Sequence, residues 1–182
     1  MQIKDLPIDK TWTLFLDRDG IINKKIDHDY VRNWKQFEFL PGVKESLKVL
    51  SAIFTRIIIV TNQRGIGKGL MSEHDLIAIH HKMLDEITET GGRVDAVFFC
   101  PDLTDDGSTH RKPKPGMAFD AKKQFPDIDF SKSIMAGDAL VDMQFGKNLN
   151  MVTVLISPEI VDNPDFHFKK LPEFALSLLP LL

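Results

Sequence analysis

The feature that most constrains this chain is a regular alternation of short apolar runs with longer amphipathic stretches. The run RIIIV at residues 56–60 is almost continuously β-branched, which is typical of a strand buried on both faces. In the stretch before it, residues 41–54, Val43, Leu47 and Leu50 recur every three or four positions, the period of a helix. Strands that alternate with helices predict an α/β fold, a parallel sheet with helices on both faces.

The same pattern extends over most of the sequence. We predict strands at residues 12–16, 56–60, 95–99, 133–136 and 151–156, and helices at residues 41–54, 73–90, 115–125 and 140–148. The last residues, 157–182, contain four prolines and are expected to pack on the rest as turns and one helix. The expected organisation is one domain over residues 1–182, with a core at about 12–156.

Composition excludes several classes of protein. The 182 residues carry 23 Lys and Arg against 26 Asp and Glu, a net charge of −3, so no basic field attracts nucleic acid or an anionic membrane. The single cysteine, Cys100, excludes an intramolecular disulfide and any zinc site that needs two or more cysteines of one chain. The N-terminus has no apolar signal region, and no apolar run approaches the length of a membrane span. We therefore expect a cytoplasmic protein.

Polar residues suited to catalysis stand directly after the predicted strands. The first strand runs into Asp17 and Asp19, two carboxylates at i and i+2 that leave the strand on the same side. The second strand leads into three hydrogen-bonding side chains, Thr61, Asn62 and Gln63. Because ligands bind at the carboxyl ends of parallel strands, we expect these residues to form one site.

Two cations and further acids follow the later strands. Arg111 and Lys112 lie in a proline-rich segment that holds them on a stiff, non-helical backbone before the next helix. The fourth strand leads into Asp138, and Asp142 follows one helical turn later. Asp142 is expected either to cap that helix or to orient Lys112 or a metal-bound water.

This combination of residues predicts phosphoryl transfer. Asp17, Asp19 and Asp138 form a hard oxygen site of the kind that holds Mg²⁺. One aspartate of the pair can attack phosphorus and form an aspartyl-phosphate. The other can protonate the leaving alkoxide and then deprotonate the attacking water. Lys112, with Thr61 and Asn62, would neutralise and orient the phosphoryl oxygens.

The order of these motifs resembles the haloacid dehalogenase (HAD) superfamily of phosphatases, over residues 12–156. More narrowly, the segments FLDRDG, DHDYV, VTNQRGIGKG, RKPKPGM and GDALVDM resemble the phosphatases of D-glycero-D-manno-heptose 1,7-bisphosphate and of histidinol phosphate. The resemblance implies a Rossmann-like HAD fold and a Mg²⁺-dependent phosphomonoesterase. It makes Asp17 the nucleophile, Asp19 the acid and base, and Asp138 a metal ligand. It also implies contacts to phosphate or substrate from Thr61, Asn62, Gln63, Arg111 and Lys112.

The spacing of the motifs leaves no room for a separate cap domain. Only a flap at about residues 23–39 and one helix lie between the first two motifs. The flap and the loop at residues 100–110 are therefore expected to bind and select the substrate, a small sugar phosphate. The flap segment richest in hydrogen-bonding groups, and the predicted substrate contact, is Asp27, His28, Asp29 and Tyr30.

Two positions depart from the pattern that the resemblance implies. Ile21 stands where the first motif usually has threonine, which puts one local hydrogen bond in doubt. The heptose enzymes often carry a zinc-binding loop, but here only Cys100 is kept, and Asp102, Ser108 and His110 occupy the other ligand positions. No zinc is expected.

Several interpretations stay open at this point. Histidinol phosphate is the second candidate substrate, and a catalytically inactive HAD domain used as a binding module is the rival from another class. His110 fits either a loop residue or a substrate contact. His74, His80 and His81 are expected on a helix surface, and the glycine-rich segment 65–69 is expected to be a flexible turn. The protein is expected to be a monomer or a weak homo-oligomer.

Overall fold

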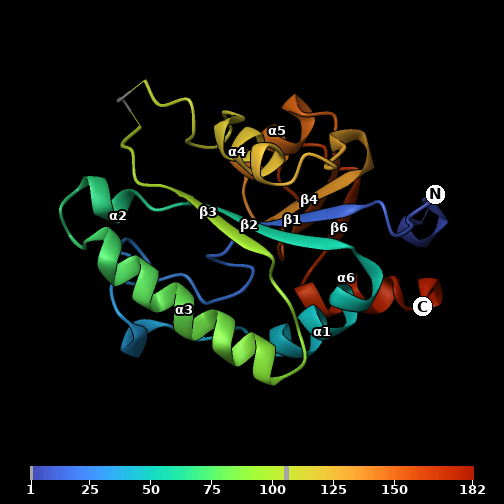
Figure 1. Ribbon diagram of the computed structural model, residues 1–182, viewed down its shortest axis with the longest axis horizontal. Coiled ribbons are helices and arrows are strands. Elements are labelled where there is room, and N and C mark those ends of the chain that lie inside the picture. The colour runs from blue at the N-terminus through green and yellow to red at the C-terminus, as the bar shows by residue number, and fades with distance from the viewer. Residues whose placement is uncertain (1, 105–106) are drawn as a thin grey trace.

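A six-stranded sheet forms the centre of the computed structural model, which describes residues 2–104 and 107–182 (Figure 1). All of its strand pairs are parallel. The strands are β1 (Thr13–Leu16), β2 (Arg56–Asn62), β3 (Ala96–Cys100), β4 (Ser133–Gly137), β5 (Val152–Ile156) and β6 (Phe166–Phe168). Their order is β3-β2-β1-β4-β5-β6, so the chain order reverses beside β1. Ligands of such sheets bind at the carboxyl ends of the strands next to this reversal.

Helices cover both faces of the sheet, as Figure 1 shows. They are α1 (Val43–Ile53), α2 (Arg64–Gly67), α3 (Glu73–Glu89), α4 (Gly116–Gln124), α5 (Leu140–Asn148) and α6 (Leu171–Ser177). Helices α1, α3 and α6 lie on one face, and α4 and α5 lie on the other. Single 3₁₀ turns are formed at Ile3–Asp5, Trp34–Gln36, Phe130–Lys132 and Leu179–Leu181. None of the helices in the described ranges is long and apolar enough to span a membrane.

The core is divided by the sheet into two apolar clusters. Successive side chains of a strand point to opposite faces, so Leu14 and Leu16 enter the cluster under α1, α3 and α6, whereas Phe15 enters the cluster under α4 and α5. All of the β1 residues are buried. This double burial explains why the central strands are nearly continuous apolar runs.

These features confirm the predicted α/β fold with a parallel sheet and helices on both faces. Five of the strands and the helices α1, α3, α4 and α5 lie at the predicted positions, within a few residues at their ends. Helix α3 begins at the predicted cap, where Ser72 and Asp75 form a capping box. Within the described residues, no cap domain is inserted between the strands.

Two short elements were not predicted. The tail contains the edge strand β6, which pairs with β5 and is followed by α6, the expected single helix. The glycine-rich segment 65–69, expected to be a flexible turn, contributes to the one-turn helix α2. A Cβ on Gly67 would stand 2.5 Å from the carbonyl oxygen of Pro101, so this turn packs closely on the loop after β3.

The flap at residues 23–39 is anchored by aromatic packing. The rings of Trp34 and Phe37 stack with centroids 4.9 Å apart, and Phe39 meets Phe37 edge-on at 5.0 Å. Asn23 bridges to Phe39, which closes the flap at its base. The segment between these ends approaches the residues after the strands, where Lys25 contacts Asp138 and Tyr30 contacts Arg64.

Candidate active site

A tight turn after β1 sets the two acids of the first motif at the sheet edge. The Asp17 amide donates to the carbonyl of Ala136 and continues the pairing with β4. Gly20 then turns the chain with φ +90°, a conformation that favours glycine. A Cβ at this position would also stand 2.2 Å from an Asp138 carboxylate oxygen. The backbone of the turn therefore favours glycine, and a larger residue would also displace the Asp138 side chain.

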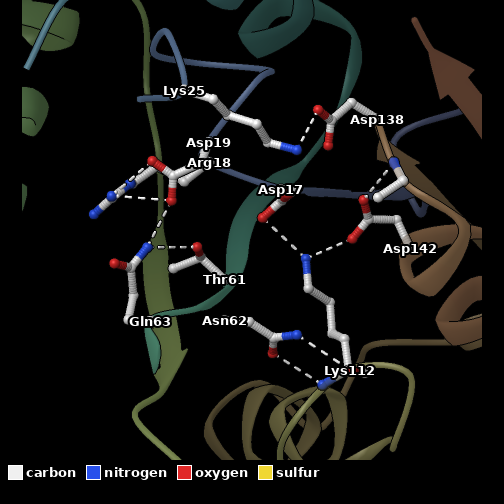
Figure 2. Close-up of polar contacts among 11 residues, drawn as sticks. Asp17, Arg18, Asp19, Lys25, Thr61, Asn62, Gln63, Lys112, Asp138 and Asp142 are labelled. Atoms are coloured by element: carbon white, nitrogen blue, oxygen red, sulfur yellow. Dashed lines mark hydrogen bonds and ion pairs between the residues drawn. The ribbon is translucent and has the colours of Figure 1, made fainter. Parts of the chain in front are cut away.

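Lys112 is the central cation of the site. Its Nζ lies 2.9 Å from Asp17 Oδ1 and 2.6 Å from Asp142 Oδ1, and Figure 2 shows it reaching between the two carboxylates. All three side chains are buried. Asp142 also accepts a hydrogen bond from the Ala139 amide at the start of α5. Both roles considered for Asp142, capping the helix and orienting Lys112, are therefore present.

Asn62 fixes the backbone that carries this lysine. Its Oδ1 accepts from the Lys112 amide at 3.0 Å, and its Nδ2 donates to the Lys112 carbonyl at 3.2 Å. The two bonds pair β2 with the proline-rich segment. Asn62 therefore holds Lys112 in position, a contact that strand-end spacing alone does not indicate.

Asp19 points away from Lys112 and is held by three side chains. Arg18 Nη2 donates to both of its carboxylate oxygens, at 2.8 and 3.0 Å, and Asn23 Nδ2 donates at 2.9 Å. Gln63 Nε2 donates to it at 2.8 Å and also to Thr61 Oγ1 at 2.9 Å (Figure 2). Donors on Arg18, Asn23 and Gln63 thus orient the carboxylate, which stays 24% exposed.

Three carboxylates of the described residues lie close enough to share a metal, and two of them, Asp17 and Asp138, belong to the predicted set. Among the described residues, oxygens of Asp17, Asp138 and Asp142 lie within 4.8 Å of one another, and Asp19 is not in this group. The reason is the set of donors that turns the Asp19 carboxylate toward Arg18. Both Asp142 oxygens accept hydrogen bonds, from Lys112 and from the Ala139 amide, whereas Asp17 and Asp138 each pair only one oxygen with a lysine. Asp17 and Asp138 are therefore the better placed to bind a cation.

The chemistry around Asp138 fits a bound cation. Its Oδ1 is buried without a hydrogen-bond partner among the described residues, and its Oδ2 lies 2.5 Å from the Lys25 ammonium. A buried carboxylate oxygen without a donor is costly unless an ion or water satisfies it. Lys25 pairs with Oδ2 only, so Oδ1 is the oxygen that suits a hard divalent ion such as Mg²⁺.

The electrostatics separate the acids. Burial raises the pKa of Asp17 to about 7, with Lys112 opposing the shift and the neighbouring carboxylates adding to it. Burial also raises the pKa of Asp138, and Lys25 opposes this. For Asp19 the effect of burial is outweighed by the Arg18 charge and the donated hydrogen bonds, so its pKa lies below the usual value. The pKa values of the two acids of the first motif are therefore shifted in opposite directions, up for Asp17 and down for Asp19.

The predicted flap contacts divide into two pairs. Asp29 and Tyr30 line a cavity of about 180 Å³ together with Asp19 and Lys25. The Tyr30 hydroxyl accepts a hydrogen bond from Arg64 Nε at 2.9 Å. Asp27 and His28 are exposed and do not line this cavity.

The loop after β3 is organised by Ser108. Its hydroxyl accepts from the amides of His110 and Arg111 at 3.1 and 3.0 Å, and it lies 3.5 Å from Cys100 Sγ. Arg111 also contacts the Asp102 carbonyl through Nη1. Both ring nitrogens of His110 are paired, with Thr109 and Asp120, which agrees with a loop residue. Residues 105–106 of this predicted loop lie outside the described residues.

Several residues that shape the site are not indicated as such by the sequence pattern. His80 was expected on a helix surface, but it is 5% exposed and contacts Arg18. Its position four residues after Leu76 and three before Met83, on the apolar stripe of α3, could have indicated burial. Lys25 and Ser108 carried no spacing signal.

Comparison with known proteins gives three further findings. Residues 13–153 match the family model described as polynucleotide kinase 3 phosphatase. The chain is 43% identical over 138 residues to a D-glycero-alpha-D-manno-heptose-1,7-bisphosphate 7-phosphatase of Mycobacterium bovis, covering 76% of this chain and 73% of the relative. It is 40% identical over 166 residues to the enzyme of that name from Campylobacter jejuni, covering 90% and 94%.

A solved structure is similar over nearly the whole chain. It is the D,D-heptose 1,7-bisphosphate phosphatase from B. bronchiseptica, complexed with magnesium and phosphate. The two structures superpose with a TM-score of 0.84 at 30% identity, over 93% of this chain and 99% of the other. The fold, the order of motifs and the relatives agree, and the chain belongs to the heptose-1,7-bisphosphate phosphatase family of HAD-superfamily phosphatases.

Proposed function

We propose that this protein is a Mg²⁺-dependent phosphatase that removes the 7-phosphate of D-glycero-D-manno-heptose 1,7-bisphosphate through a phosphorylated Asp17. The observation that carries the proposal is the environment of Asp17, a buried carboxylate paired with Lys112 and within 4.8 Å of Asp138 oxygens. Such a site suits an anionic nucleophile and an anionic phosphate ester. The names of the curated relatives support the sugar substrate.

Asp17 acts as the nucleophile in the first step. Its free carboxylate oxygen attacks phosphorus, and the bond between phosphorus and the C7 oxygen of the sugar breaks. Lys112 Nζ, 2.9 Å from the other Asp17 oxygen, neutralises charge on the carboxylate and on the phosphoryl oxygens. Burial of Lys112 works against its charge, but Asp142 and Asp17 outweigh this and hold its pKa above the usual range.

Asp17 and Asp138 are the side chains that would hold Mg²⁺, with Asp142 kept on Lys112. A bound Mg²⁺ screens the repulsion between the carboxylate and the phosphate and polarises a phosphoryl oxygen. The buried Asp138 Oδ1, which has no partner among the described residues, supports this assignment. Asp19 as the third ligand stays a prediction, and its carboxylate is assigned to proton transfer.

Asp19 moves the protons of both steps. The bound phosphate dianion favours the protonated form of the Asp19 carboxyl, which counteracts the low pKa of the free site. Protonated Asp19 gives its proton to the C7 oxygen as the sugar leaves, and the resulting carboxylate accepts a proton from the water that attacks the aspartyl-phosphate. Gln63 orients Asp19, and Thr61 Oγ1 accepts the second Gln63 hydrogen bond. Thr61, Asn62 and Gln63 therefore support Lys112 and Asp19, beside any contact that they make to phosphate.

The sugar is expected to lie in the cavity beside Asp19. Asp29 and Tyr30 line this cavity and would bind sugar hydroxyls. Asp27 and His28, which are exposed, are proposed to contact the outer part of the substrate, and Arg111 is proposed to bind its second phosphate.

We further propose one domain over residues 1–182, with the tail packed on the core, and a cytoplasmic protein that is a monomer or a weak homo-oligomer without nucleic-acid or membrane partners. Zinc is not expected, because Cys100 has Ser108, not further thiols, in its loop. Light scattering after gel filtration and elemental analysis test the oligomeric state and the metal content. One tightly held zinc per chain would contradict this part of the proposal.

The function is tested by phosphate release from a panel of esters, with Mg²⁺ or with EDTA. The panel contains both anomers of the heptose bisphosphate, histidinol phosphate and a 3′-phosphorylated oligonucleotide. We expect the heptose bisphosphate to have the highest kcat/KM, ³¹P NMR to show the 1-phosphate retained, and EDTA to abolish turnover. A higher kcat/KM for histidinol phosphate would make that ester the preferred substrate. No turnover of any ester would favour the catalytically inactive binding module.

A further inference from the structure

A buried histidine lies behind the active site, on the apolar stripe of α3. His80 is 5% exposed, and its ring lies near that of Phe99, with centroids 6.2 Å apart. Buried imidazoles need hydrogen-bond partners in the same way as other polar groups. The partner here is a second buried polar side chain, Arg18.

Arg18 carries a full charge into the core. Its position after Leu14 and Leu16 on the same side of the chain directs its side chain toward α3, and it is 0% exposed. Nη1 lies 3.0 Å from His80 Nε2, Nη2 donates to both oxygens of Asp19, and Nε has no partner among the described residues. Two side chains therefore hold this guanidinium through its Nη atoms, His80 at Nη1 and Asp19 at Nη2.

The geometry fixes the state of the imidazole. A guanidinium can only donate, so His80 Nε2 must carry a lone pair and the ring must be neutral with its proton on Nδ1. Burial, followed by the Arg18 charge, lowers the pKa of His80 to about 3, which agrees with a neutral ring. His80 is therefore a permanent acceptor for Arg18 under ordinary conditions.

We propose that His80 is a positioning residue for catalysis, which holds the Arg18 guanidinium so that it fixes the Asp19 carboxylate for proton transfer. The fork of an arginine has a rigid geometry, so a bond to one of its nitrogens sets the direction of the others. Without the acceptor on α3, Arg18 keeps its charge but loses one of the two contacts that set its orientation. General acid catalysis contributes a factor of roughly 10²–10⁴ to the rate. A misoriented Asp19 would lose part of that factor.

This inference rests on the proposed phosphatase activity, and it makes a prediction that a merely structural role does not make. The acid is needed most when the leaving group is a poor one, such as a sugar alkoxide. It is needed least for 4-nitrophenolate. The kcat/KM value covers the steps up to and including phosphoryl transfer, in which the leaving group departs. The dependence of kcat/KM on the leaving-group pKa therefore shows how well Asp19 donates its proton.

The experiment measures kcat/KM with saturating Mg²⁺ for aryl phosphates of rising leaving-group pKa and for the heptose bisphosphate. His80→Leu removes the acceptor at similar volume, His80→Gln offers an amide oxygen in its place, and His81→Leu on the exposed neighbouring position is the matched control. We expect His80→Leu to lower kcat/KM for the heptose bisphosphate at least tenfold. The same substitution should lower kcat/KM for 4-nitrophenyl phosphate less than threefold. His80→Gln should restore most of the loss, and His81→Leu should change neither value.

Equal losses on all substrates, or no loss, would overturn the positioning role while leaving the phosphatase intact. An inactive wild-type chain would instead overturn the proposed function and this inference together. If His80→Leu does not fold, His80→Ala is assayed with and without added imidazole. Restoration of sugar turnover by imidazole would support the role, and its failure in folded protein would contradict it.

Discussion

Replacing Lys112 by methionine should strongly destabilise the metal-free protein. At an effective dielectric constant of about 20, one ion pair at 2.9 Å is worth about 6 kcal/mol of Coulomb energy. Lys112 makes two such pairs, at 2.9 and 2.6 Å, and its side chain is 3% exposed. The cost of burying the charges cancels much of this energy, and losing one partner of a buried pair typically costs about 3–5 kcal/mol.

The assay is urea unfolding in EDTA, followed by tryptophan fluorescence, for wild type and Lys112→Met. We expect the free energy of unfolding to fall by about 3–5 kcal/mol, because Asp17 and Asp142 are left as buried, unpaired carboxylates. The matched control is Lys114→Met, an exposed lysine in the same proline-rich segment, which should change stability by less than about 0.5 kcal/mol. In the Lys112→Met background, Asp142→Asn should recover part of the loss.

The same substitution should also lower kcat by at least about 100-fold at saturating Mg²⁺, since it removes the cation that neutralises the reacting group. A loss of stability below about 1 kcal/mol would contradict the electrostatic account of the buried cluster. Near-normal kcat in a folded variant would contradict the assignment of Lys112 to phosphate.

Three further predictions concern other parts of the site. Asp17→Asn should keep the fold in circular dichroism but lower kcat by far more than tenfold, about 1.4 kcal/mol, and a smaller loss would exclude covalent catalysis there. His80 has a folded pKa of about 3 against 6.5 in the unfolded chain. The unfolded chain therefore binds this proton first as the pH falls, so stability should be lost between pH 6.5 and 3, by up to about 1.4 kcal/mol per pH unit. His80→Gln should flatten this part of an acid-unfolding curve, and an unchanged curve would mean that His80 is charged when folded. Ser108→Ala should raise the KM for the heptose bisphosphate with kcat kept, because the amides of His110 and Arg111 lose their acceptor; an unchanged KM would mean that the loop does not read the substrate.

The fold could be predicted from the sequence because the central strands are buried on both faces. Runs such as residues 56–60 have few stable alternatives to a buried strand, and their alternation with helices fixes a parallel sheet. The edge strand β6 gave no comparable signal, since its three residues are only partly buried. Its pairing with β5 depends on tertiary contacts, among them the bonds between Asp165 and Thr153.

For the site, the sequence predicts which residues lie close together but not how their side chains are oriented. Strand-end positions identify Asp17, Lys112 and Asp138 as neighbours, because the carboxyl ends of parallel strands share one edge. They do not say which way a side chain turns there. Asp19 turns to Arg18 because Arg18, Asn23 and Gln63 donate to it. Asp142 takes the position beside Asp17 through its bond to Lys112. These choices depend on three-dimensional partners that spacing along the chain does not encode.

The most direct test of the central claim is the detection of a phosphorylated Asp17. Wild-type protein is quenched with acid during turnover of the heptose bisphosphate, reduced with borohydride, digested and analysed by mass spectrometry. Reduction converts an aspartyl-phosphate to homoserine, so the account predicts homoserine at position 17 only when both substrate and Mg²⁺ are present. Modification at another residue, or full turnover with no modified peptide at any quench time, would contradict catalysis through Asp17.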